Sequence, residues 1–216
     1  MTPDALKRLA AVGEGPRLEF KHRVPRPDRI AREIIAFANT DGGTILLGVD
    51  DDGTVVGLRD ADEELFALDA ALADHIEPAV EVRVRRVPIS RKREVVVVEV
   101  APSDHRPHFL RPDGDPTRRR QAFVRVGEES VEASRTAVDL MKAEGRGDAV
   151  HFTFGDAERR LLEYLDRYER ITVREYGRMA RLPPWRASRT LVALARAGIV
   201  QLHPRPGGDD YFTAAA

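Results

Sequence analysis

The sequence contains no cysteine. This absence excludes disulfide bonds, thiolate nucleophiles, zinc sites with cysteine ligands and iron–sulfur clusters. The chain also lacks an apolar run near the roughly 18 residues of a membrane span, and its first ten residues, MTPDALKRLA, lack the apolar core of a signal peptide. We therefore expect a cytoplasmic protein that has no membrane partner.

Several enzyme signatures are missing as well. The chain has no Gly-Lys dipeptide and hence no GxxxxGK[ST] phosphate loop, so we expect no nucleotide cofactor. It has neither an HExxH motif nor a nucleophile elbow with a Ser-His-Asp pattern. His105 and His108 are separated by Pro107, which argues against a helical pair of metal ligands.

The composition is that of a globular protein, with 42% hydrophobic and 33% charged residues among 216. This length suits one large domain or a main domain with a small companion. The formal net charge of -1 argues against a strongly basic nucleic-acid binder. However, basic residues outnumber acidic ones in residues 151–216, and all of them are arginine, which suits contact with phosphate.

The chain is organised around the stretch from Glu14 to Gly57. Residues 17–21 read as a short strand, and residues 44–49 read as a strand that is apolar on both faces. Between them, apolar residues recur at three- and four-residue spacing, which predicts a helix that ends at the turn residues 39–43. The stripe of this helix consists of Ile30, Ile34, Phe37 and Ala38.

Three carboxylates flank these two strands. Glu14 and Glu19 lie before and on the first strand, and Asp51 follows the second, so pairing of adjacent strands would bring them together. Convergent carboxylates repel one another unless a cation lies between them, and oxygen ligands suit Mg²⁺ or Mn²⁺. Alternatively, residues 50–52 form an ordinary acidic hairpin turn and Glu14 merely starts the strand.

Four segments, read in order, carry a resemblance to a known family: LEFK, AFANTDGGTILLGVDDDGTVVG, VVVVEVAPSDHRPHFL and AFVRVGEES. Together they resemble the Schlafen AlbA_2 domain over roughly residues 10–135. Some members of that family are nucleases, and many prokaryotic members are known only as DNA-binding or regulatory proteins.

In the nuclease members, a Glu-x4-Glu pair around the EFK motif and an Asp after the GV strand form the cleaving site. The resemblance therefore implies that Glu14, Glu19 and Asp51 are catalytic residues that hold Mg²⁺ or Mn²⁺. Asp50 is the adjacent alternative for the third position, and Lys21 would contact phosphate.

A second group of basic residues follows this stretch. After a predicted helix over residues 60–75 and two strands over 80–87 and 94–100, an irregular connection runs over residues 101–120. Basic side chains at its end and on the next strand could hold a phosphate backbone, although basic loop tips are more often only solvated. These residues are Arg118, Arg119, Arg120 and Arg125.

The C-terminal part has a different character. Helices are predicted over residues 157–168, 173–181 and 184–197, and a strand–turn–strand segment ends the chain. This order resembles a winged helix-turn-helix, whose third helix enters the DNA major groove. Winged helices also serve as dimerisation or docking modules. The candidate contacts on the third helix are Trp185, Arg186, Arg189, Ala193 and Arg196.

We therefore predict an α/β (α+β) fold: a Schlafen AlbA_2-type mixed sheet with helices over residues 1–148, then a winged-helix domain over residues 150–216. The favoured function is nucleic-acid binding, with metal-dependent endoribonuclease activity on tRNA-like or single-stranded RNA. The alternative is a non-catalytic transcriptional regulator that binds DNA. The vertebrate family members place two lobes around RNA, so a chain with one lobe is expected to form a homodimer.

Overall fold

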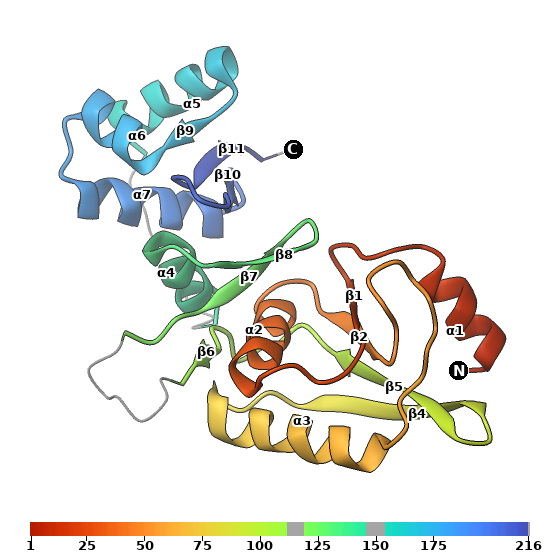
Figure 1. Ribbon diagram of the computed structural model, residues 1–216. Helices are drawn as coiled ribbons and strands as arrows, with labels where there is room; N and C mark the ends of the chain where they lie inside the picture. Colours follow the sequence, from red (N-terminus) through yellow and green to blue (C-terminus); the bar gives the residue numbers. More distant parts are fainter. Residues whose placement is uncertain (112–118, 146–153, 216) are drawn as a thin grey trace. The chain divides into compact units, whose positions relative to one another are not determined.

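The computed structural model describes residues 1–111, 119–145 and 154–215. The fold is mixed α/β, as predicted (Figure 1). Contacts divide the chain into two compact units, Met1–Glu132 and Ala133–Ala216. Within the described residues, no helix combines the length and the apolar character needed to cross a membrane.

The first unit contains three helices and a set of strands within its described residues. Its helices are α1 (Pro3–Ala10), α2 (Pro27–Ala38) and α3 (Ala61–His75). Its longer strands are β1 (Leu18–Lys21), β2 (Gly43–Leu47), β4 (Val82–Ser90), β5 (Arg93–Val100), β7 (Phe123–Val126) and β8 (Glu129–Glu132). The two-residue strands β3 (Ile76–Glu77) and β6 (Phe109–Leu110) pair with each other.

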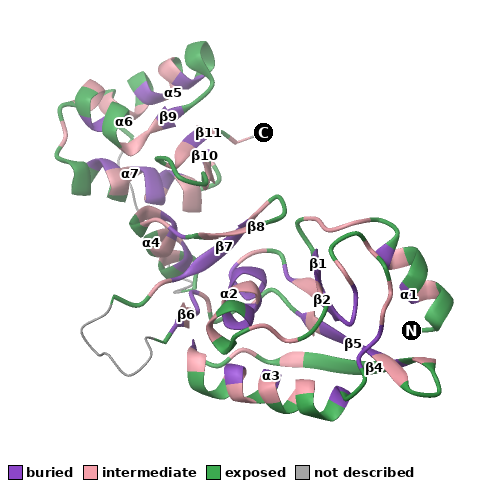
Figure 2. Cartoon of the chain, in the orientation of Figure 1, coloured by how far each residue is buried: buried purple, intermediate pink, exposed green. Residues whose placement is uncertain are grey.

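A four-stranded sheet in the order β1-β2-β5-β4 forms the centre of this unit. Strands β1 and β2 are parallel, and Leu18 lies opposite Thr44, whereas the other neighbours are antiparallel. The valine-rich strand β5 lies inside the sheet and is buried, and β4 forms an edge with an exposed face (Figure 2). The sequence pattern predicted both features.

The period of two along each strand divides the core between the two faces of the sheet. On one face, Phe20 and Leu46 pack with Leu6 of α1. On the other face, Ile45 and Leu47 pack with the apolar stripes of α2 and α3. Strand β2 is therefore covered on both faces, as its continuous apolar run indicates.

Two adjacent glycines make the sharp turn from α2 into β2 possible. Gly42 has φ +72°, and a Cβ atom there would lie 2.7 Å from the carbonyl oxygen of Val100. A Cβ atom on Gly43 would lie 2.3 Å from Cε1 of Phe37. Both distances are shorter than the contacts that real Cβ atoms make, so this turn has no room for side chains at either position.

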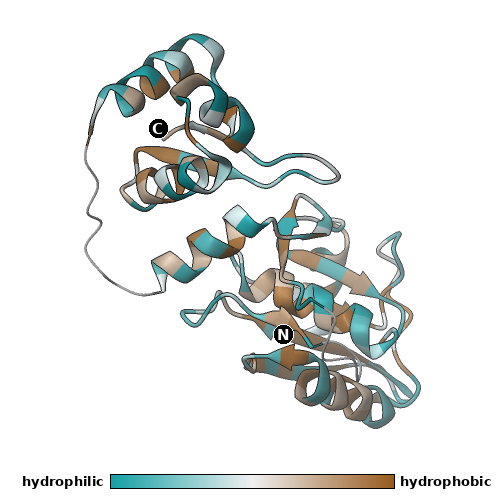
Figure 3. Cartoon of the chain, turned by 90° about the vertical axis from the view of Figure 1, so that its left-hand side faces the viewer, coloured by the Kyte–Doolittle hydropathy of each residue, from teal (hydrophilic) through white to brown (hydrophobic). Residues whose placement is uncertain are grey.

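The second unit contains four helices and a three-stranded antiparallel sheet within its described residues. Its core is formed by the inward faces of its last three helices and by Phe212 and Ile171, while hydrophilic residues lie on the outer helix faces (Figure 3). The elements are α4 (Arg135–Glu144), α5 (Asp156–Tyr168), β9 (Ile171–Thr172), α6 (Val173–Ala180), α7 (Pro184–Arg196), β10 (Val200–His203) and β11 (Tyr211–Ala214).

Helix α4 packs against α7 within the second unit. The hydroxyl groups of Thr136 and Ser188 lie 3.0 Å apart, and the Ser134 side chain, which caps α4, donates a hydrogen bond to Asp210. The contacts thus divide the chain after Glu132, whereas the sequence places the domain boundary near residue 148. The α4 pattern predicts a helix, but it does not indicate which unit the helix packs against.

Candidate functional site

The alternation of β1 determines where its charged residues lie. Leu18 and Phe20 pack on the α1 side of the sheet, so Glu19 and Lys21 share the opposite face. Glu19 is 6% exposed. The Lys21 ammonium donates hydrogen bonds to the Glu19 carboxylate and, at 2.9 Å, to the carbonyl oxygen of Phe20. The charge of Glu19 is thereby partly neutralised by a residue of its own strand.

A second cation reaches Glu19 from β7. The Arg125 side chain is 2% exposed, and its Nη1 atom lies 3.0 Å from Glu19 Oε2 and 2.9 Å from Glu33 Oε2. Its Nη2 atom donates to the carbonyl oxygen of Gly15 at 2.9 Å, and its guanidinium lies 4.7 Å from the ring centroid of Phe37. A buried guanidinium requires such partners, because an unpaired buried charge is strongly unfavourable.

Glu33 of α2 and Ser130 of β8 complete what we call the Glu19 cluster: Glu19, Lys21, Glu33, Arg125 and Ser130. Ser130 donates a hydrogen bond to Glu33 and accepts one from Arg125 at 3.1 Å. Burial raises the pKa of Glu33 above its ordinary value, and the nearby Glu19 carboxylate acts in the same direction, while Ser130 and Arg125 oppose the shift. The cluster links β1, α2 and the β7–β8 hairpin.

The structure places the three predicted metal ligands in different settings. Glu14 is half-buried and accepts a hydrogen bond from the backbone N–H of Phe20 at 2.7 Å. Glu19 is engaged by Lys21 and Arg125, and Asp51 lies exposed in the turn after β2. Among residues 1–111, 119–145 and 154–215, no three His, Cys, Asp or Glu side chains form a group that could hold a metal ion.

In this arrangement the carboxylates do not fit a three-ligand Mg²⁺ or Mn²⁺ site. Two cations already compensate the charge of Glu19, so a metal ion would have to displace them from the same oxygens. Asp50, the alternative third ligand, is engaged too, because its carboxylate lies 2.6 Å from Nδ1 of His22. The metal site stays a prediction that requires Glu19 to exchange partners.

The predicted phosphate contacts of the first unit divide into buried and exposed residues. Arg125 differs from the expectation, because its buried guanidinium cannot reach a phosphate backbone from this position. Arg119 and Arg120 are exposed, and Arg120 lies 3.4 Å from Glu77 and 5.3 Å from the ring centroid of Phe109. Arg118 lies outside the described residues.

The predicted contacts of the second unit lie on α7. Ala187, Leu191 and Leu194 face the core, and α4 packs against part of the remaining surface of α7, so only the rest of that surface is turned to solvent. Trp185 is 62% exposed, and the Arg186 guanidinium lies 5.6 Å from its ring centroid. The remaining predicted contacts are Arg189, which is exposed, and Ala193 and Arg196, which are half-buried.

Three residues near Glu19 and β2 do not emerge from the sequence patterns: His22, Glu33 and Ser130. Glu33 lies beside the apolar stripe of α2, where an acidic residue is usually solvated. One signal could have found it. Arg125 interrupts the apolar strand Phe123–Val126, and a buried arginine needs carboxylate partners from elsewhere in the chain.

The comparisons with known proteins place the first unit in a family. The Schlafen, AlbA_2 family matches residues 14–134, which is more than half of the chain. The N-terminal domain of an ATP-dependent DNA helicase RecG-related protein from Nitrosomonas europaea has 30% sequence identity and a TM-score of 0.43, over 61% of this chain and 90% of that one.

A second solved structure, the DIP2311 protein from Corynebacterium diphtheriae, has 20% identity and a TM-score of 0.43. The alignment covers 71% of this chain but only 30% of that protein. No curated protein matches the chain. The family match includes both β1 with Glu19 and β7 with Arg125, and the chain belongs to the Schlafen AlbA_2 family.

Proposed function

We propose that this protein binds nucleic acid and that its second unit does so as a winged helix-turn-helix. The order α5, α6, α7 followed by the β10–β11 hairpin supports this assignment. The observation that carries the proposal is the solvent face of α7, where Trp185, Arg186 and Arg189 are exposed together while the opposite face packs in the core. Arginine suits phosphate contact, because its planar guanidinium donates two parallel hydrogen bonds.

The geometry supports binding better than metal-dependent cleavage. Cleavage by the first unit would need the carboxylate of Glu19 to leave Lys21 and Arg125, whereas the exposed arginines of α7 need no rearrangement of that kind. The endoribonuclease activity and its RNA substrate therefore remain predictions from the family resemblance. The proposal covers both RNA and DNA as ligands, and the binding experiment below compares them.

A homodimer also belongs to the proposal. One Schlafen-type unit per chain would become two in a dimer, and a two-fold dimer would match a palindromic duplex site. The dimer is tested by measuring the molar mass of the protein in solution, with and without nucleic acid.

The proposal is tested by fluorescence anisotropy with labelled single-stranded RNA, single-stranded DNA and duplex DNA, in buffer that contains EDTA. Phosphate contacts release counterions, so the logarithm of the binding constant should fall linearly with the logarithm of salt concentration. Arg186→Ala should weaken binding and reduce the magnitude of the salt slope by about one.

The matched control is Arg17→Ala, which removes the same charge from an exposed position in the first unit. It should leave the affinity and the slope unchanged. Absence of salt-dependent binding to all three nucleic acids would overturn the proposal and favour a protein-docking role for the second unit.

A further inference from the structure

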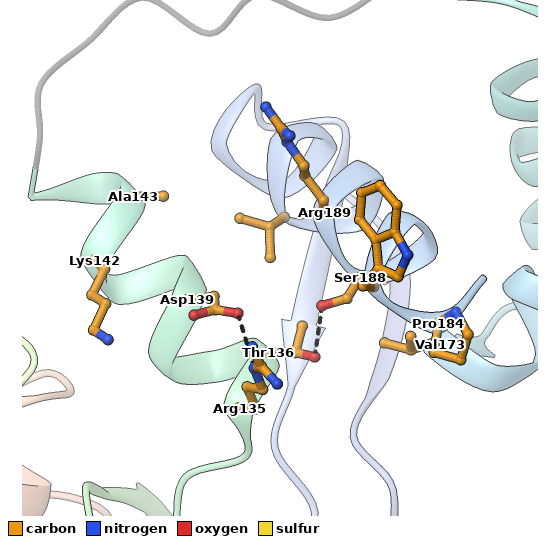
Figure 4. A pocket seen from close by; sticks show the side chains of 11 residues that line it. Arg135, Thr136, Asp139, Lys142, Ala143, Val173, Pro184, Ser188 and Arg189 are labelled. Atoms are coloured by element: carbon orange, nitrogen blue, oxygen red, sulfur yellow. Dashed lines mark hydrogen bonds and ion pairs between the residues drawn. The ribbon is translucent and has the colours of Figure 1, made fainter. Parts of the chain in front are cut away.

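A pocket of about 750 Å³ lies between α4 and α7 in the second unit (Figure 4). This volume falls within the range of about 300–1,000 Å³ that is typical of small-molecule sites. The pocket is bounded at one side by the Thr136–Ser188 hydrogen bond, which holds α4 against α7. The Glu19 cluster does not contribute to it, because the described residues that line the pocket belong to the second unit.

The position of α4 limits what α7 can contact. Ser188 and Val192 of α7 line the pocket that α4 borders, and Val192 is only 9% exposed. A helix with its side chains is about 10–12 Å wide, and the major groove of duplex DNA is about 12 Å wide. The groove therefore admits one helix but not a helix pair, so α4 obstructs duplex access along this flank of α7.

The lining of the pocket combines a flat apolar surface with positive charge. Trp185, Val173 and Val192 are aromatic and aliphatic members of the lining that come from α6 and α7. Arg135, Lys142 and Arg189 supply three cationic side chains, against one carboxylate, Asp139, which forms an ion pair with Arg135. A ligand that suits this lining has a planar ring and a negatively charged group.

We propose that this pocket binds a nucleotide, with its base stacked on Trp185 and its phosphate beside Arg189. Bases stack on exposed aromatic side chains regardless of their identity, and guanidinium groups bind phosphate through charge-assisted hydrogen bonds. The nucleotide is either free or an unstacked nucleotide of a single strand. If the nucleotide belongs to a single strand, the inference rests on the proposed nucleic-acid function. It then deepens that function, because it identifies single-stranded nucleic acid as the class of ligand.

The experiment uses the full chain and its intrinsic fluorescence. Trp185 is the only tryptophan in the sequence and lines the pocket, so the protein's tryptophan emission comes from this site, and the Arg189 variant tests whether a quenching ligand occupies the pocket. The protein is titrated with AMP, with a single-stranded oligodeoxyadenylate and with a blunt duplex of the same length. We expect AMP to quench the emission in a saturable way and the duplex to quench it little. The oligodeoxyadenylate should also quench it if the pocket binds a nucleotide of a single strand.

Arg189→Ala should raise the dissociation constant of the quenching ligand by about tenfold or more, because it removes a charged hydrogen-bond donor from the pocket. The matched control is Arg178→Ala, which removes an exposed arginine of the same unit that does not line the pocket. It should leave the dissociation constant unchanged. If both variants raised the dissociation constant equally, the ligand would be attracted by the overall positive charge of the unit and not by the pocket, and the proposal would be overturned.

The remaining outcomes separate this proposal from the proposed function. Absence of quenching by millimolar AMP and by the strand overturns the pocket assignment, even if anisotropy shows salt-dependent binding of nucleic acid. Quenching by AMP without any binding of strands or duplex supports the pocket as a site for free nucleotides, while the proposed function fails. Quenching by both AMP and the strand supports the single-strand source.

Discussion

At the scale of single residues, the partners of Arg125 depend on which side of its strand faces the core. The sequence shows an arginine in an apolar strand and suggests a phosphate contact. The structure turns the guanidinium inward, where Glu19, Glu33 and the carbonyl oxygen of Gly15 accept its hydrogen bonds. An ion cluster of this kind is strongly destabilised when one partner is removed, because the remaining charges stay buried.

His108 leads to a prediction about pH. Its Nδ1 atom lies 2.8 Å from the carbonyl oxygen of Pro78 and its Nε2 atom 2.7 Å from the Ser103 hydroxyl. A carbonyl only accepts, so the neutral ring donates from Nδ1 and accepts from Ser103 at Nε2. Burial lowers the pKa of His108 below its ordinary value of 6.5; the Pro78 hydrogen bond opposes this shift and the nearby His105 adds to it.

Because the folded-state pKa is lowered, the unfolded chain binds more protons just below pH 6.5. The free energy of unfolding should therefore fall as the pH drops from about 6.5 through the folded-state pKa. His108→Gln should remove this part of the pH dependence and cost about 1–3 kcal/mol at neutral pH through lost buried hydrogen bonds. Urea unfolding followed by circular dichroism at a series of pH values measures both effects.

The control for this prediction is His105→Gln, because His105 is exposed and lies in the same segment. It should keep most of the pH dependence. An unchanged pH dependence in His108→Gln would show that other groups are responsible.

At the scale of elements, local patterns were reliable guides. The helix predicted over residues 173–181 is preceded by the sequence T-V-R-E, which is typical of a capping box, and α6 begins with it. Thr172 Oγ1 accepts from the Glu175 N–H at 3.2 Å, and the Glu175 carboxylate accepts from the Thr172 N–H at 2.8 Å. This prediction is confirmed because every partner in the motif lies within one helical turn.

The turn between α2 and β2 yields a prediction about packing. Gly43→Ala would place a methyl group 2.3 Å from the buried ring of Phe37, so the ring or the backbone must shift. We expect a loss of about 1–3 kcal/mol in the free energy of unfolding, as for other overpacked cores. The measurement is the midpoint of urea unfolding.

Gly15→Ala serves as the matched control, because nothing lies within 4 Å of a Cβ atom at that position. It should change stability by less than about 0.5 kcal/mol, like most substitutions away from tight packing. Similar losses in the two variants would contradict the packing argument.

At the scale of the whole molecule, the family resemblance predicts that the first unit cleaves RNA in a metal-dependent reaction. If the family resemblance extends to activity, labelled tRNA and single-stranded RNA should be cleaved with Mn²⁺ or Mg²⁺ and remain intact with EDTA. Glu19→Gln should abolish these products, because the amide keeps the volume of the side chain but removes its charge. Binding by the second unit should persist, because the Glu19 cluster lies in the first unit. The products are resolved by denaturing gel electrophoresis.

The control for this prediction is Asp41→Asn, which neutralises an exposed carboxylate outside the Glu19 cluster. It should cleave like the parent protein. Cleavage by Glu19→Gln at the parental rate would contradict the carboxylate mechanism, and intact RNA under all conditions would favour the non-catalytic alternative.

The sequence by itself determined the helices, the longer strands other than β8, the central position of β5 and the family. These properties depend on patterns that repeat every two to four residues or on short motifs, and both can be recognised in the sequence alone. Only the tertiary structure decided that Arg125 neutralises Glu19, 106 residues away, and that α4 packs on α7. Both depend on side chains that meet across large sequence separations, because charges and apolar surfaces pair by proximity in space, and no local pattern records that proximity.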